Sequence, residues 1–338
     1  MARHREPGTP PRALVVLAGL VLVGVTGVAI WFLPAQATPE WSSPLTAASP
    51  PAAAFPSTTA TPSAGATASP SGYVAFVDTA ENPRFDPADA ARRTGVRWFL
   101  LGRVTAGPSG CAPRWGGTLE PGLDLVANRI PSLRAAGGQA GLAFGGPAGT
   151  ELAGACVAQD ALTSAYRRMI GAFGASFVEF DVRDGGDLPA VRRRARALAD
   201  LQRDQDLAVI YSLPLGPAGL APSDVEMLRQ TRAAGAELGT VNLLAPIEPL
   251  TAPEGRMRRL AAAVRAAHGQ VREALRIDEA TAWGRIALTA VLAGSGDLGL
   301  LDARKLSSYA ARHHLAWLSA RGAPPSAAVV RALRGPRG

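Results

Sequence analysis

Short apolar runs alternate with longer alanine-, arginine- and leucine-rich stretches through most of the chain after residue 72. The apolar runs have the length of buried strands and the intervening stretches follow a helical period, which predicts parallel strands joined by crossover helices. The expected strands are Tyr73–Asp78, Arg97–Val104, Gln139–Gly145, Phe177–Val182, Ala208–Leu213, Thr240–Ala245, Arg285–Leu292 and Leu315–Ser319. Eight strands in about 250 residues predict an α/β fold, a (β/α)8 TIM-type barrel. A doubly wound open sheet is the alternative, but no G-x-G-x-x-G motif follows the first strand.

Helix start signals fall between these strands. Asp86-Pro87 precedes an expected helix at Ala88–Thr94, Asp160 precedes one at Ala161–Phe173, and Pro222-Ser223-Asp224 precedes one at Val225–Ala234. Functional groups of a barrel come from the carboxyl ends of its strands and from the loops that follow them. Candidate site residues are therefore expected at those positions.

The chain begins with a segment that predicts a membrane anchor. Residues 13–33 form an uncharged apolar run, and about 20 such residues cross a bilayer as a helix. Arginines precede the run and none follows until Arg84, so the N-terminus (residues 1–12) is expected in the cytoplasm and the rest of the chain outside the cell membrane. The alternative is a signal peptide cleaved after Ala37, which would make the protein secreted.

Residues 34–72 consist mainly of Ala, Pro, Ser and Thr. Such a segment cannot bury enough apolar surface to offset its chain entropy, so we expect a disordered linker. The single-pass anchor and this linker would precede a barrel domain at residues 73–334. The formal net charge is +8, but the arginines are scattered rather than clustered, which argues against a nucleic-acid partner.

The two cysteines, Cys111 and Cys156, lie in the part of the chain expected outside the membrane. Disulfides persist there, so we expect a bridge between them, with two free buried thiols as the alternative. The histidines have no ligand spacing with the cysteines. We therefore expect neither a metal site nor a cofactor.

Alternate polar residues mark the fourth expected strand. Glu179, Asp181 and Arg183 are spaced by two, which directs all three to one side of a strand, the interior of a barrel. We predict an ion pair between Asp181 and Arg183. A purely structural role for this buried pair is the simplest interpretation.

The segment Glu179-x-Asp181-x-Arg183 also resembles the Asp-x-Asp-x-Glu motif that ends the fourth strand of family 18 glycoside hydrolases, the chitinases. Further matches lie in order along residues 73–322, the one at Leu142 to the family as a whole and the others to its bacterial branch. They are Cys111-Ala112-Pro113-Arg114-Trp115-Gly116-Gly117, Leu142-Ala143-Phe144-Gly145-Gly146, Tyr211-Ser212-Leu213-Pro214, Val241-Asn242-Leu243 and Trp317.

The resemblance implies a degenerate catalytic motif. In the family the motif glutamate protonates the glycosidic oxygen, and the aspartate before it orients the N-acetyl group of the substrate. Arg183 cannot act as that acid, because a guanidinium stays protonated far above neutral pH. Glu179 replaces the first aspartate, and Asp181 is kept. The sixth strand of the family usually continues into Met-Asp-Tyr, whereas Ala245-Pro246-Ile247-Glu248 stands here.

Three functions remain open from the sequence. The first is a catalytically impaired chitinase-like protein that binds N-acetylglucosamine-containing glycans, either chitin or peptidoglycan fragments. Its sugar contacts would come from Tyr211, Asn242, Trp317, Arg183 and Glu248, although Tyr211 and Trp317 could also be core residues. The second is an active hydrolase whose acid has moved to Glu179, Asp184, Asp187 or Glu248. The third is an envelope scaffold with a filled cleft.

Overall fold

The computed structural model describes residues 69–335, and these residues form a (β/α)8 barrel. Eight parallel strands follow one another around the barrel, and β1 pairs with both β2 and β9 to close it. They are β1 (Gly72–Asp78), β2 (Trp98–Ala106), β4 (Gln139–Gly145), β5 (Phe177–Asp181), β6 (Ala208–Pro214), β7 (Thr240–Pro246), β8 (Ile286–Leu292) and β9 (Trp317–Gly322). All eight expected strands are confirmed, and the open-sheet alternative is wrong.

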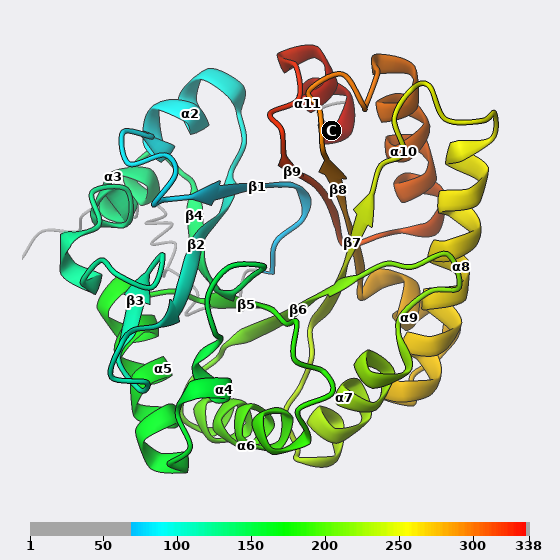
Figure 1. The fold of residues 1–338 in the computed structure, drawn as a ribbon. Coiled ribbons are helices and arrows are strands. Elements are labelled where there is room, and N and C mark those ends of the chain that lie inside the picture. Colours follow the sequence, from blue (N-terminus) through cyan, green and yellow to red (C-terminus); the bar gives the residue numbers. More distant parts are fainter. Residues whose placement is uncertain (1–68, 336–338) are drawn as a thin grey trace, which may run out of the picture. The chain divides into compact units, whose positions relative to one another are not determined.

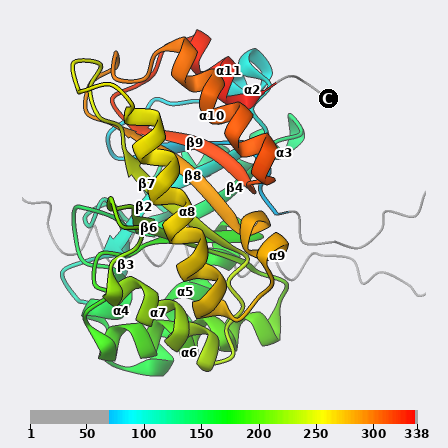
Figure 2. The same ribbon diagram turned by 90° about the vertical axis from the view of Figure 1, so that its right-hand side faces the viewer.

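Helices surround the strands as a ring (Figure 1). The α-helices are α2 (Pro87–Thr94), α3 (Ile130–Ala135), α4 (Leu152–Ala155), α5 (Gln159–Phe173), α6 (Leu188–Asp204), α7 (Pro222–Ala233), α8 (Arg256–Leu275), α9 (Glu279–Gly284), α10 (Leu300–His313) and α11 (Ala327–Arg334). Two 3-10 turns, η1 (Pro121–Leu123) and η2 (Ala127–Arg129), precede α3. The side view shows α8 running along the outside of the barrel (Figure 2).

One strand was not anticipated. β3 (Pro113–Trp115) pairs antiparallel with β2 at the end of the loop that contains Cys111. It is too short to give a sequence pattern of its own. The predicted membrane anchor at residues 13–33 lies outside the described residues. Within residues 69–335, no helix combines the length and the hydropathy needed to cross a membrane.

Helix α2 begins and ends where its sequence predicts. The side chain of Asp86 accepts a hydrogen bond from the backbone N–H of Asp89 at 2.9 Å, and Pro87 occupies the first helical position. Gly95 ends the helix with a φ of 70°, a left-handed conformation that glycine adopts without a steric penalty. Local signals thus mark both ends of this helix, and Arg334 of α11 also binds the carbonyl oxygens of Thr94 and Gly95 at its end.

The core has two layers. Inside the barrel, near the amino ends of the strands, a small cluster fills the space, made of Val74, Leu100, Phe177, Ile210, Ala287 and Trp317. Outside it, a much larger cluster packs the strands against the helices. Phe177 points inward and Phe180 points outward against Tyr166 of α5, as the two-residue period of a strand requires. The polar residues of β5 lie above the inner cluster, toward the carboxyl ends of the strands.

A disulfide joins Cys111 to Cys156, with the two Cα atoms 4.6 Å apart. The predicted bridge is confirmed and the alternative of free thiols is wrong. The bond connects the loop before β3 to the end of α4, so it fastens two loops at the carboxyl-terminal face of the barrel.

Replacing both cysteines by alanine is expected to lower the free energy of unfolding by about 4 kcal/mol, because the bridge joins residues separated by 45 positions. Urea denaturation of the variant and of the wild type measures the difference. Reducing agent should lower the stability of the wild type and leave the double variant unchanged. Equal stabilities of wild type and variant would show that the bridge adds nothing.

Candidate functional site

The carboxylates of β5 lie inside the barrel. Glu179 is fully buried and Asp181 is 3% exposed. Their neighbours Val178 and Phe180 belong to the outer core layer. The predicted orientation of Glu179 and Asp181 is therefore confirmed, and the motif lies above the apolar floor of the barrel.

Asp181 contacts three arginines. Arg183 donates from Nε to Oδ1 at 2.7 Å, Arg103 of β2 lies 3.3 Å from Oδ2, and Arg321 of β9 lies 3.4 Å from the same oxygen. The predicted pair between Asp181 and Arg183 is confirmed. Three charge-assisted contacts hold this carboxylate in one orientation.

Glu179 is bound even more tightly. Both of its carboxylate oxygens accept hydrogen bonds from Nη2 of Arg321, and Oε1 also accepts from the hydroxyl of Ser212. Ser212 accepts from the side-chain amide of Asn242 at 2.7 Å, and Asn242 accepts from the hydroxyl of Thr289 at 2.9 Å. One chain of hydrogen bonds thus crosses the interior from β9 through β5, β6 and β7 to β8.

Arg103 completes the group on the other side of Asp181. Its Nε donates to Asp78 of β1 at 3.0 Å, and its guanidinium lies 5.1 Å from the ring centre of Phe76. Gly146 has a φ of 122°, which favours glycine, and a Cβ there would lie 2.4 Å from Nη1 of Arg103, so a larger residue would require this side chain to move. The second glycine of the Phe-Gly-Gly segment therefore leaves room for Arg103, which no motif in the sequence indicates as a site residue.

The charges of the six ionised groups in this cluster sum to zero. Asp78, Glu179 and Asp181 supply three negative charges, and Arg103, Arg183 and Arg321 supply three positive ones. Buried charges are tolerated only when each has a close partner of opposite sign. We refer to these six side chains as the ion-pair cluster.

Arg183 is the exposed member of the ion-pair cluster, with 41% of its side chain accessible. Its hydrogen bonds to residues 69–335 involve only Nε, so neither terminal nitrogen has a hydrogen-bond partner in the described part of the chain. Arg183 stands in the position that the family resemblance assigns to the acid. The guanidinium offers donors at that position and no proton for transfer near neutral pH.

Asp224, in the first turn of α7, also lies near Arg183. Its side chain is 7% exposed, and burial raises its pKa, while the backbone at Ala221 and the charge of Arg183 act in the opposite direction. In the sequence, Asp224 forms part of a helix start signal, and that pattern does not predict a buried carboxyl beside Arg183.

Tyr211 and Trp317 lie away from the mouth of the barrel. Tyr211 is fully buried in the outer layer, where its hydroxyl lies 3.2 Å from Thr231 of α7. Trp317 is 1% exposed and belongs to the apolar floor near the amino ends of the strands. Their positions do not support the predicted sugar contacts, and both match the alternative of core residues. Asn242 points inward but is fully buried in the hydrogen-bond chain.

The carboxylates considered as replacement acids are already engaged. Asp184 accepts two hydrogen bonds, at 2.9 and 2.8 Å, from Arg194, which is fully buried and also binds Glu151. Asp187 caps α6 by accepting from the backbone N–H of Ala190. The loop from Arg183 to Asp187 is therefore held by both of its aspartates.

Glu248 follows β7 and forms an ion pair with Arg259. The hydrogen bond from Arg259 lowers the pKa of Glu248, which makes it a poorer acid at neutral pH. Glu248 lines a cavity of about 410 Å³ at the carboxyl ends of β6 and β7, together with Leu215, Pro217 and Ile247. Glu248 is thus a residue of the predicted binding set that lines a cavity at this face.

Among residues 69–335, no group of histidine, cysteine and carboxylate side chains could hold a metal ion.

Replacing Arg321 by methionine is expected to lower the free energy of unfolding by roughly 3–5 kcal/mol, because Glu179 would remain buried without its main partner. The double variant Arg321→Met/Glu179→Gln should recover most of this loss. Arg183→Met, at the exposed end of the cluster, should cost about 1 kcal/mol or less. Chemical denaturation at pH 7 measures all three, and a double variant no more stable than Arg321→Met would contradict a coupled pair.

The buried carboxyl of Asp224 predicts that its contribution to the stability of the folded state falls as the pH rises. Its raised pKa means that the folded state binds the proton more tightly. This contribution to stability is fully present below the unfolded pKa of about 4 and is lost as the pH rises through the folded pKa. Relative to wild type, Asp224→Asn should therefore gain stability between pH 4 and pH 7. A stability difference that does not change with pH would contradict the raised pKa.

Comparison with known proteins shows two relatives by sequence. The chain is 29% identical over 180 residues to the "Probable bifunctional chitinase/lysozyme" of Escherichia coli (strain K12), a match that covers 51% of this chain and 20% of that protein. It is 32% identical over 185 residues to "Endochitinase 11" of Metarhizium anisopliae, which covers 51% of this chain and 34% of the relative. The chain thus spans between a fifth and about a third of these relatives. No protein-family model matches it.

The fold is shared with solved chitinases. A structure of catalytic-site mutants of active domain 2 of the thermostable chitinase from Pyrococcus furiosus, complexed with chito-oligosaccharides, superimposes with a TM-score of 0.68. The sequences are 21% identical, and the match covers 80% of this chain and 96% of the other. At this identity the similarity shows a common fold.

Proposed function

We propose that this chitinase-like protein, whose sequence relatives and barrel are those of family 18 glycoside hydrolases, binds N-acetylglucosamine-containing glycans without cleaving them. The observation that carries the proposal is Arg183. It occupies the place of the catalytic acid and forms an ion pair with Asp181, the one aspartate of the motif that is kept. Both chemical roles of the motif are thereby lost.

The loss of activity has two physical causes. Arg183 cannot donate a proton near neutral pH, and loss of general acid catalysis alone costs about 10²–10⁴ in rate. Asp181, in turn, would have to leave three guanidinium contacts before it could orient an acetamido group. Restoring an acid at position 183 alone would leave Arg103 and Arg321 on Asp181.

Glycan binding is supported by the exposed side chain of Arg183, whose terminal nitrogens bind no described residue, and by the cavity beside Glu248 at the carboxyl-terminal face. The Pyrococcus furiosus complex offers a parallel, since catalytic-site mutants of that domain are described with bound chito-oligosaccharides. A barrel of this kind can therefore hold an oligosaccharide with its catalytic site altered.

An envelope location is part of the proposal. The disulfide between Cys111 and Cys156 suits an oxidising compartment outside the cytoplasm. The apolar run at residues 13–33 would tether the barrel to the outer side of the membrane.

A scaffold role is the second candidate, and a specific observation favours it. The interior of the barrel is closed by the ion-pair cluster and by the hydrogen bonds of Ser212, Asn242 and Thr289. A ligand that entered deeply would have to displace these contacts. A scaffold protein would therefore bind no oligosaccharide at this face.

Titration calorimetry with chitotetraose and with a muropeptide disaccharide is expected to show binding by the wild-type protein, while a fluorogenic chitobioside shows no turnover. Arg183→Ala should weaken binding about tenfold, because a hydrogen bond to a charged group is removed. Arg168→Ala on α5, an exposed arginine away from the mouth, is the matched control and should bind as the wild type does.

Three other outcomes would change the assignment. Turnover abolished by Asp184→Asn or Glu248→Gln would identify a relocated acid and overturn the non-catalytic proposal. Turnover lost in Asp224→Asn would do the same for the buried carboxyl beside Arg183. The absence of both binding and turnover would leave the scaffold role.

A further inference from the structure

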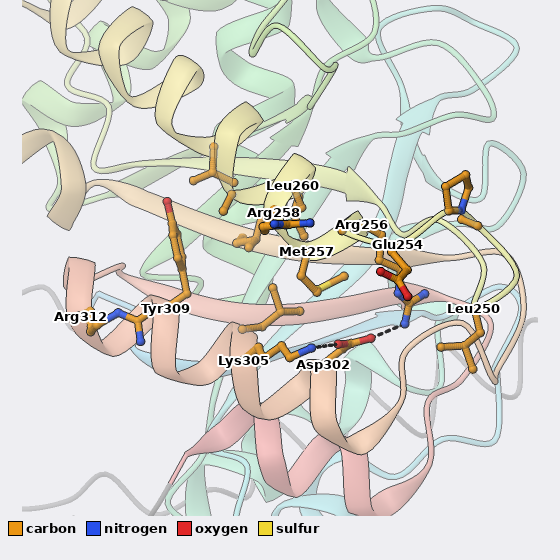
Figure 3. Close-up of a pocket in the computed structure, with 17 residues that line it drawn as sticks. Leu250, Glu254, Arg256, Met257, Arg258, Leu260, Asp302, Lys305, Tyr309 and Arg312 are labelled. Carbon is orange, nitrogen blue, oxygen red and sulfur yellow. Dashed lines mark hydrogen bonds and ion pairs between the residues drawn. The ribbon is translucent and has the colours of Figure 1, made fainter.

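A groove of about 690 Å³ lies between α8 and α10 on the outside of the barrel (Figure 3). Val264, Leu288 and Leu306 form its buried floor, and Met257 and Leu260 are half-buried on its α8 side. Leu288 belongs to β8, so the groove reaches the sheet between the two helices. Its apolar floor distinguishes this groove from the polar interior of the barrel described above.

The groove exists because these two helices do not pack closely together. Helix α5 packs on α6, α6 on α7, α7 on α8, and α10 on α11, whereas α8 and α10 make few close approaches. Exposed apolar surface between helices is usually removed by such packing. Here the two helices leave an open groove.

Tyr309 places a buried polar group in this groove. Its side chain is 9% exposed and extends from α10 toward α8, and the proton of its hydroxyl has no acceptor among residues 69–335. Burial raises the pKa of Tyr309, which outweighs the lowering by the charges of Arg265 and Arg312 and by a hydrogen bond that Arg265 donates to the hydroxyl oxygen. A buried donor without an acceptor is costly, and a ligand that accepts its hydrogen bond removes that cost.

The charged side chains along the groove are mostly basic. Two of the lining residues are acidic, Glu254 and Asp302, and four are basic, Arg256, Arg258, Lys305 and Arg312. Asp302 is engaged by Arg256 and, at 3.1 Å, by Lys305. Within the described part of the chain, Arg258 and Arg312 have no ion-pair partner. The rim is therefore suited to a negative charge.

We propose that the groove between α8 and α10 binds a single-chain fatty carboxylate, with its head group at Tyr309 and Arg312 and its chain along Leu306, Leu260 and Met257. The stretch of α10 from Asp302 to Arg312 that lines the groove is roughly 15 Å long at the rise of an α-helix. An extended acyl chain of medium length fits this distance. A carboxylate presents two acceptor oxygens to the hydroxyl of Tyr309 and the guanidinium of Arg312.

The test uses dodecanoate below its micelle-forming concentration and the full-length protein in titration calorimetry. Dodecanoate should bind, and dodecanol, which has the same chain without the charge, should bind at least tenfold more weakly. Acetate, which has the head group without the chain, should not bind measurably. Equal binding of dodecanol, or no binding of dodecanoate, would overturn the proposal.

Three variants locate the site. Tyr309→Phe and Arg312→Ala should each weaken dodecanoate binding about tenfold, because each removes a contact to the charged head group. Leu306→Trp should fill the floor and abolish binding. Arg168→Ala on α5 is the matched control and should bind as the wild type does. Unchanged affinity in both Tyr309→Phe and Arg312→Ala would place the ligand elsewhere and overturn the assignment.

Two further arms separate other occupants. Tighter binding of dodecyl phosphate than of dodecanoate would replace the carboxylate by a lipid phosphate. Displacement of dodecanoate by an acidic amphipathic peptide, with higher affinity for the peptide, would replace the lipid by a protein partner. Chitotetraose should not compete with dodecanoate, so this test and that of the glycan-binding proposal can fail separately.

Discussion

The pair between Glu179 and Arg321 is the interaction on which the interior of the barrel depends. Both side chains are buried, and an ionised group inside a barrel is strongly unfavourable without a close partner of opposite sign. Arg321 satisfies Glu179 and also reaches Asp181, so it joins β9 to β5 across the interior. The hydrogen bonds that continue through Ser212 and Asn242 make β6 and β7 part of the same polar layer.

Because of this layer, the charges at positions 179, 181 and 183 depend on one another, and no one of them can be interpreted alone. A glutamate at position 183 would leave four carboxylates beside only two guanidiniums, those of Arg103 and Arg321. Like charges at such distances raise each other's pKa or force a proton into the cluster. With arginine at 183 the charges balance without a proton. In the proposed non-catalytic function, the same arginine that balances the charges of the cluster is the residue that leaves position 183 without a carboxylic acid.

The sequence predicts local relations well and distant ones poorly. The strands, the start of α2 and the pair between Asp181 and Arg183 follow from periods and signals a few residues long. Arg321 lies 142 residues from Glu179, and no local pattern joins them. Trp317 lies in the floor of the barrel because β9 begins at this residue. The sequence predicts a strand that begins at Leu315, which would place Trp317 further along it.

The position of Tyr211 could have been read from the period of its own strand. Ser212 opposes Asp181 and points inward, so its neighbour must face the helices. A family motif gives the identity of a residue, whereas the side it faces comes from the strand. Among the six members of the ion-pair cluster, only Arg183 combines high exposure with terminal nitrogens that bind no described residue. A ligand that leaves the buried pairs intact can therefore bind Arg183 without breaking a hydrogen bond that this side chain's terminal nitrogens make to the described residues.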